Sequence, residues 1–293
     1  YEISACLVGS GDVYKRQSLF FGRNEECGLR CVYHGWKFDL DGHCLEMPNE
    51  PAESNFRDKI KALAYPCRER GGLLWAYMGP REVPPPLPDL EANMLPEGEC
   101  NVSGIQRGCN WLQALEGDID TSHLAFLHFG TQQAEDLPEG TFQHYLLKDR
   151  TPSYSVLNTE FGTMYGAYRE GKPGTNYWRI AQFLFPCHTI IPTGVLGLQI
   201  FARSWVPMDD NHTMAYTLMS KDWLGRVTAG RDVWPALLPN STDWFGRFRM
   251  AQCRENDYLI DRDRQRRKES WTGIAGVHTQ DQAITESMGP ILD

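Results

Sequence analysis

The sequence contains no long hydrophobic run and no block of basic residues. Its most apolar stretches, residues 73–78 and 183–198, are short or interrupted by Pro, His and Gly, well below the ~20 residues of a membrane-spanning helix. The net charge is −9, from 38 acidic and 29 basic residues among 293, and no Lys/Arg cluster is long enough to follow a phosphate backbone. We therefore expect neither a membrane nor a nucleic acid as a partner.

A regular cysteine framework is also absent. Nine cysteines, an odd number, are spread over the whole length without fixed spacing, and no apolar secretory leader opens the chain. Small secreted domains that depend on disulfides show the opposite pattern. This cysteine usage favours a reducing compartment, and we expect a cytoplasmic protein.

The distribution of strand-like runs, turn residues and prolines along the chain indicates two domains. Residues 1–17 have neither the period of a strand nor that of a helix, and we interpret them as a non-native leader. From residue 18 to 80, strand-like runs at 30–38 and 73–78 alternate with glycine-containing turns, including the hairpin signal Asp41-Gly42. Because proline lacks an amide donor and fixes φ, residues 79–88 predict a stiff connector. We expect a small β domain at 18–80 and a larger domain at 81–293.

The larger domain is predicted to be α+β. Residues 110–129 have the spacing of a helix with an acidic, histidine-bearing face, and strand-like runs follow between 154 and 222. Residues 243–268, which are rich in charge, are predicted to form one long helix.

Two histidines and several carboxylates crowd into residues 110–128. On a helix, Asp120 and His123 lie on one face, whereas His123 and His128 diverge by about 140°. Their rings meet only if a helix end or a π-bulge lies between them. Two histidines and one carboxylate on one face of a metal leave three positions open, the arrangement that holds Fe(II) for dioxygen chemistry. From spacing alone, two ordinary half-buried histidines are an equal alternative.

The pattern Asp120-x2-His123-x4-His128, within the run Asn-Trp-Leu-Gln-Ala-Leu-Glu-Gly-Asp-Ile-Asp-Thr-Ser-His, resembles the mononuclear iron motif of Rieske non-haem iron oxygenases. The branch it resembles is that of phthalate dioxygenase catalytic subunits, and the resemblance extends from about residue 18 to the C-terminus. It implies a Rieske β domain followed by a helix-grip, START-like catalytic domain with an antiparallel sheet.

The resemblance also implies residue roles. A late aspartate is the third iron ligand in the family, and the segment 276–289 places Asp281 there. Asp257 and Asp261 are alternatives, although charged helix faces are usually only solvated. Asp120 resembles the bridging aspartate, which hydrogen-bonds an iron histidine and reaches a cluster histidine of the neighbouring subunit.

The small domain carries half of a cluster motif. Cys31-Val-Tyr-His34-Gly-Trp resembles the second half of a Rieske motif, whose thiolate and imidazole bind a [2Fe–2S] cluster. The family also has an earlier Cys-x-His pair, but no histidine precedes His34 in this sequence. We therefore expect an incomplete ligand set and, relative to the family, incomplete ends of the chain. As an alternative, Cys27, Cys31, His34 and Cys44 are a candidate Cys3His zinc site.

For function, the resemblance implies a homotrimer that receives electrons from a separate NADH-dependent flavin/iron–sulfur reductase. Iron and dioxygen would then hydroxylate, or oxidatively demethylate, an aromatic and carboxylated substrate. A carboxylate entering an apolar pocket needs a cationic partner, for which Arg150 and Arg179 are candidates; each is otherwise a surface or ion-pair arginine. Rival interpretations are a non-catalytic ligand-binding protein on the same fold and a zinc-stabilised interaction module. We expect this polypeptide itself to be deficient in electron transfer.

Overall fold

A computed structural model describes residues 5–6, 19–51, 53–192, 199–228 and 235–291. The chain divides into two compact units, Tyr1–Asp89 and Leu90–Asp293, and the division falls at the end of the proline-rich stretch. As predicted, residues 79–88 contain neither helix nor strand. The predicted leader lies largely outside the described residues.

The first unit is built from two small antiparallel sheets and a core of its own. One sheet has the order β2-β3-β4-β5, and the other has the order β1-β6-β7. The strands are β1 (Ala5–Cys6), β2 (Arg23–Glu25), β3 (Gly28–Arg30), β4 (Lys37–Phe38), β5 (Cys44–Glu46), β6 (Tyr65–Arg70) and β7 (Leu73–Ala76), with short helices η1 (Leu19–Phe21) and η2 (Phe56–Lys59). The core consists of Leu19, Cys31, Trp36, Phe38, Cys44, Met47 and Ala62. The run at residues 30–38, predicted as strand-like, thus consists of the last residue of β3, a loop and β4.

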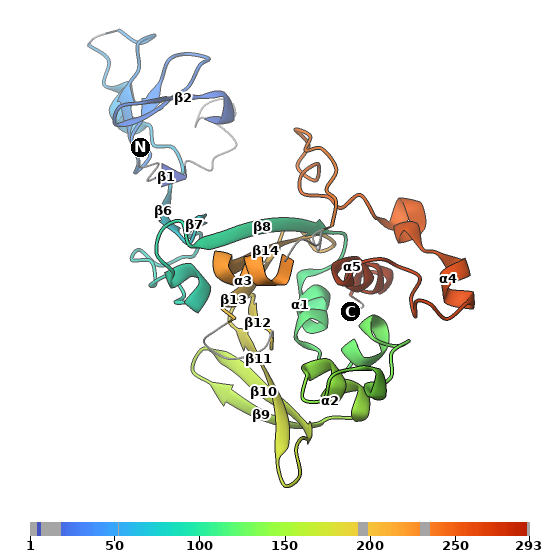
Figure 1. The fold of residues 1–293 in the computed structure, drawn as a ribbon. Coiled ribbons are helices and arrows are strands. Elements are labelled where there is room, and N and C mark those ends of the chain that lie inside the picture. Colours follow the sequence, from blue (N-terminus) through green and yellow to red (C-terminus); the bar gives the residue numbers. More distant parts are fainter. Residues whose placement is uncertain (1–4, 7–18, 52, 193–198, 229–234, 292–293) are drawn as a thin grey trace. The chain divides into compact units, whose positions relative to one another are not determined.

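The second unit centres on a seven-stranded antiparallel sheet of order β8-β14-β13-β12-β11-β10-β9 (Figure 1). Its strands are β8 (Cys100–Arg107), β9 (Ser153–Thr159), β10 (Gly162–Glu170), β11 (Asn176–Leu184), β12 (His188–Ile190), β13 (Phe201–Pro207) and β14 (Thr213–Ser220). The helices are η3 (Glu91–Met94), α1 (Trp111–Ile119), η4 (Leu124–His128), η5 (Ala134–Asp136), α2 (Phe142–Lys148), α3 (Lys221–Thr228), η6 (Arg254–Leu259), α4 (Arg262–Arg266) and α5 (Val277–Ser287). The predicted α+β class and antiparallel sheet are confirmed.

Helix α1 packs between the sheet and α5 (Figure 1). Its N-cap is Asn110, whose side chain accepts from the amide of Leu112 at 2.9 Å, while the side-chain oxygen of Gln113 accepts from the amide of Asn110 at 3.3 Å. This capping box satisfies amides that would otherwise lack partners. At Gly117 a Cβ atom would lie 3.2 Å from a methyl group of Thr285, so the small residue allows α5 to approach closely. The sheet and α5 therefore fix α1 from two sides.

The prediction of one long helix over residues 243–268 is wrong. The only helices in this segment are η6 and the short α4, and the second half of η6 is irregular because three of its residues have positive φ: Asp257 at 50°, Tyr258 at 53° and Leu259 at 52°. Met250 is buried and bridges to Leu237. A charge-rich segment lacks the continuous apolar stripe by which a surface helix packs against a core. The backbone groups of this segment therefore form their hydrogen bonds in local turns and bridges.

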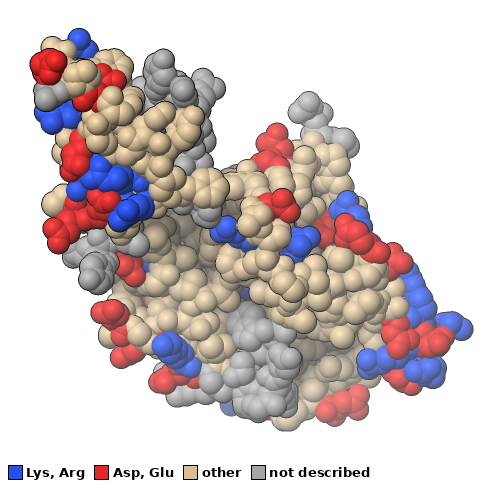
Figure 2. Space-filling model, turned by 90° about the horizontal axis from the view of Figure 1, so that it is seen from above, with Lys and Arg blue, Asp and Glu red and all other residues tan. Residues whose placement is uncertain are grey.

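Acidic and basic side chains are intermixed on the face drawn in Figure 2. Around α4 they form pairs, such as Arg267 with Glu269 and Arg266 with Asp263. None of the helices that the structure describes is long and apolar enough to cross a membrane.

Candidate metal centre

The end of α1 positions the first histidine. The helix stops at Asp120, whose backbone is extended and whose carboxylate accepts from the amides of Ser122 at 2.8 Å and His123 at 3.1 Å. The same carboxylate lies 3.1 Å from Nδ1 of His123. Asp120 therefore forms the turn after the helix and also orients the imidazole ring.

A π-helix brings the second histidine to the first. Residues Leu124–His128 form η4, in which the amide of Phe129 bonds the carbonyl of Leu124, five residues earlier. The Nε2 atoms of His123 and His128 lie 3.2 Å apart. The prediction that a helix end or a π-bulge separates these residues is confirmed, because an undistorted helix would point the rings apart.

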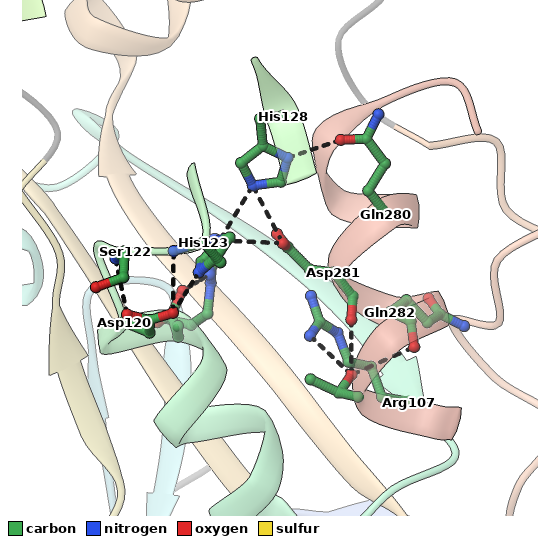
Figure 3. A network of polar contacts seen from close by, with 11 residues as sticks. Arg107, Asp120, Ser122, His123, His128, Gln280, Asp281 and Gln282 are labelled. Atoms are coloured by element: carbon green, nitrogen blue, oxygen red, sulfur yellow. Dashed lines mark hydrogen bonds and ion pairs between the residues drawn. The ribbon is translucent and has the colours of Figure 1, made fainter. Parts of the chain in front are cut away.

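Helix α5 adds a carboxylate from the other end of the sequence. Oδ1 of Asp281 lies 3.5 Å from Nε2 of His123 and 3.2 Å from Nε2 of His128 (Figure 3). The ligand atoms of these three residues all lie within 4.8 Å of one another. Two imidazoles and one carboxylate converging in this way fit a mononuclear divalent metal such as Fe(II). Their role as ligands stays a prediction.

The Nδ1 atom of each imidazole lies within hydrogen-bonding distance of another side chain. Nδ1 of His123 faces Asp120, and Nδ1 of His128 lies 2.7 Å from Oε1 of Gln280. Both rings therefore turn Nε2 towards Asp281. Such partners fix the ring orientation that a metal site requires.

The charges of the site are strongly coupled. Burial alone would lower the pKa of His123, but hydrogen bonds with Asp120 and Asp281 outweigh it and raise this pKa to about 9. Burial alone would raise the pKa of Asp281, yet the hydrogen bonds with His123 and His128 hold it well below its usual range. Without metal, the site thus stores a proton on His123 beside an ionised carboxylate.

We expect the affinity for a divalent metal to rise with pH up to about pH 9. Below its raised pKa the His123 ring is charged, so Nε2 must release a proton before it can bind metal. One proton released per metal bound gives about a tenfold gain in affinity per pH unit. This slope is measured by competition for Zn²⁺ against a chelator at several pH values. The affinities are corrected for protonation of the chelator and for the binding that persists in His123→Ala. An affinity independent of pH would contradict it.

Several predicted residues lie in other settings. Asp261 caps α4 by accepting from the amide of Arg264 at 2.9 Å, and Asp257 lies in η6; neither belongs to a metal-binding group among the described residues. Arg150 donates to the carbonyls of Ala125, in η4, and Gln132. Arg179 is buried and donates to Oγ1 of Thr121 at 3.1 Å. Arg150 therefore bonds the backbone around His128 and Arg179 bonds the side chain of Thr121, and their predicted substrate role stays a prediction.

The half motif of the small domain lies in the loop between β3 and β4. Cys31 is buried, and the amide of Gly35 bonds the carbonyl of Cys31 at 3.0 Å. Gly35 has a φ of +77°, and a Cβ there would meet Pro48 at 2.9 Å, so the turn requires glycine. A Rieske cluster takes two cysteines and two histidines. The predicted ligands Cys31 and His34 would supply only one of each, so these residues alone do not fit a complete cluster.

The candidate zinc ligands do not come together. In the part of the chain that the structure describes, groups of three or more metal-binding side chains are His123 with His128 and Asp281, and Asp39 with Asp41 and His43. Neither group contains a cysteine. The structure therefore does not gather Cys27, Cys31, His34 and Cys44 into a zinc site.

Sequence reasoning missed three residues that support the site. Gln280 holds His128, Arg107 lies buried beneath α5 and donates to Thr285, and Asp118 ties α1 to the sheet through Arg203. The one available signal was the position of Gln280 directly before Asp281. Arg107 and Asp118 are recognisable only once the strands are paired.

Comparisons with known proteins give matches over almost the whole chain. A family model described as "LigXa C-terminal domain like" matches residues 76–293, and the Rieske [2Fe-2S] domain model matches residues 14–65. The 3-chlorobenzoate-3,4-dioxygenase oxygenase subunit of Comamonas testosteroni is 44% identical over 290 residues, covering 94% of this chain and 66% of that protein. The phthalate 4,5-dioxygenase oxygenase subunit of Pseudomonas putida is 36% identical over 306 residues, covering 98% and 67%. This chain thus spans about two thirds of the length of these relatives.

The fold is also found among solved structures. The crystal structure of dicamba monooxygenase bound to dicamba superposes with a TM-score of 0.57 at 15% sequence identity, covering 93% of this chain and 72% of that one. At this identity the likeness concerns the fold alone.

Proposed function

Because this chain belongs to the family of Rieske non-haem iron oxygenases, we propose that it is an oxygenase subunit that acts on an aromatic, carboxylated substrate. The reaction class is hydroxylation or oxidative demethylation with dioxygen. The observation that carries the proposal is the convergence of His123, His128 and Asp281 on one point from two distant parts of the chain. Three ligands on one side of a metal leave room for dioxygen on the other.

Fe(II), when bound, supplies the site at which dioxygen is activated; the chain positions and tunes it. In this proposal His123, His128 and Asp281 hold the metal, and the single negative charge of Asp281 balances half of its double positive charge. Asp120 keeps the ring of His123 in place from behind. Its side chain remains 42% exposed, which supports the proposed role as a bridge to a neighbouring subunit.

Electron delivery completes the proposal for the family's reaction. We propose a homotrimer that receives electrons from a separate NADH-dependent reductase through a [2Fe–2S] cluster. In this polypeptide Cys31 and His34 provide two of the four cluster ligands, and no histidine precedes His34. We therefore predict that the chain as given assembles no complete cluster and is deficient in electron transfer.

Arg150 and Arg179 are the proposed partners of the substrate carboxylate. Arg150 is close to the iron ligands in structure, since it donates to a carbonyl of η4. We expect the double alanine variant to bind phthalate-type ligands at least about tenfold more weakly, the loss of a charge-assisted hydrogen bond of about 1.5 kcal/mol. Calorimetric titration of the iron-loaded protein measures it. Unchanged affinity in a variant that retains its iron would exclude these anchors.

The proposed function can be tested without electron delivery. Nitric oxide added to the Fe(II)-loaded protein under anaerobic conditions should bind at an open position and give an electron paramagnetic resonance signal. Aromatic carboxylates should perturb that signal, whereas aliphatic carboxylates of similar size should not. A signal unchanged by every aromatic carboxylate would contradict a substrate site beside the iron.

A further inference from the structure

The two histidines of the metal centre are supported from behind by chemically different groups. His123 has the carboxylate of Asp120 at its Nδ1, at 3.1 Å. His128 has the neutral amide of Gln280 at its Nδ1, at 2.7 Å (Figure 3). A carboxylate acceptor makes an imidazole a stronger donor to metal than a neutral acceptor does.

The orientation of the Gln280 amide is fixed by its second contact. Its Nε2 donates to the carbonyl of Ile274 at 2.8 Å. Since the NH₂ end is used there, the oxygen end faces His128, and an amide oxygen can only accept a hydrogen bond. His128 must therefore carry a proton on Nδ1, so that Nε2, which faces Asp281, is the nitrogen that a metal would bind.

The support of Gln280 is itself anchored. The turn that carries Ile274 is closed by Thr272, whose Oγ1 accepts from the amide of Ile274 at 3.0 Å. Gln280 lies in the first turns of α5, where its amide bonds the carbonyl of Gly276 at 3.1 Å. One helix thus supplies both the carboxylate of the metal centre and, one residue earlier, the group that holds the second histidine.

Water is a poor substitute for this contact. The His128 side chain is only 7% exposed, whereas that of His123 is 23% exposed. A buried Nδ1–H that loses its acceptor bears the full cost of desolvation. The ring would then be free to rotate or to change tautomer.

We infer that Gln280 is a positioning residue of the metal centre: it locks His128 in the tautomer that presents Nε2 to the metal and leaves His128 the weaker donor of the two histidines. The inference rests on the proposed metal site and adds to it an asymmetry between its imidazoles. The matching arrangement at His123 has a charged partner. The two nitrogen ligands are therefore tuned to different extents.

The test compares the Zn²⁺ affinity of Gln280→Leu with that of Gln280→Glu in the full chain. The affinity is measured by competition against a chelator, and the binding that persists in His123→Ala is subtracted. Leucine removes the acceptor and is expected to weaken Zn²⁺ binding by about 10- to 100-fold, the usual effect of losing such a partner. Glutamate restores an acceptor and should recover most of this loss. Ile284→Glu, which places the same charge on an exposed position of α5, should leave the affinity unchanged.

A second readout separates positioning from packing. In the Co²⁺-loaded protein, the Nδ1–H protons of both histidines should give shifted, exchangeable proton resonances in water. Gln280→Leu should accelerate solvent exchange of one of them and spare the other.

The inference would be overturned if Gln280→Leu bound Zn²⁺ as tightly as the unsubstituted protein, or if both Gln280 variants lost the same affinity. Either result would leave the metal site in place. Failure of the unsubstituted protein to bind Zn²⁺ or Co²⁺ in a His123-dependent way would overturn the proposed metal site, and this inference with it.

Discussion

Replacing Asp281 with alanine is expected to empty the metal centre. The carboxylate is the only anionic group within 3.5 Å of both Nε2 atoms among the described residues, and it offsets the charge of a divalent ion. Losing a direct ligand should cost more than the ~100-fold upper range for losing a partner behind a ligand. Iron in the anaerobically purified protein should fall from about one ion per chain to background, and any oxygenase activity with it.

The matched control is Asp263→Ala. Asp263 is 64% exposed and pairs with Arg266 on α4, so the same substitution there removes a charge without touching the histidines. Iron content should stay unchanged in this variant. Iron retained by the Asp281 variant, with its circular dichroism unaltered, would show that the third ligand lies elsewhere.

Replacing Asp118 with alanine is expected to cause the largest loss of stability. This carboxylate is 5% exposed, forms an ion pair with Arg203, and accepts from Oγ1 of Thr189 at 2.5 Å and from Nε1 of Trp205 at 3.1 Å. These contacts fasten α1 to β12 and β13. Removing one member of a buried pair leaves an uncompensated guanidinium, so the free energy of unfolding of the second unit should fall by about 3–5 kcal/mol.

Urea denaturation, followed by tryptophan fluorescence and by circular dichroism, measures this loss. Asp58→Ala is the matched control, since Asp58 is 67% exposed and its pair with Arg57 lies on the surface. Exposed pairs contribute about 1 kcal/mol or less. A similar small effect at Asp118 would mean that this carboxylate does not hold α1 to the sheet.

The local geometry around His123 and His128 was predictable from sequence because its signals are local. On a regular helix the rings of His123 and His128 would point apart, and that mismatch predicted the distortion observed as η4. The strand-like runs and the proline-rich connector were recognisable for the same reason, since residue types with strong backbone preferences lie side by side there.

Contacts between distant segments were not predictable in this way. The position of Gln280 directly before Asp281 places it near the predicted site, but it does not indicate that the amide meets His128, 152 residues earlier. Arg150 was selected for its charge, but its hydrogen bonds go to backbone carbonyls, which leave no mark in a sequence. The prediction of one long helix over residues 243–268 was wrong because charge alone was taken as a helix signal. A helix in a folded protein is stabilised mainly by tertiary packing.

The most direct test of the proposed centre is the iron and acid-labile sulfide content per chain of the anaerobically purified protein, with and without His123→Ala. We predict about one iron per chain, no sulfide, and loss of the iron in the variant. About three irons with sulfide would contradict the predicted lack of a complete cluster. No iron, or iron that the substitution leaves in place, would contradict the centre formed by His123, His128 and Asp281.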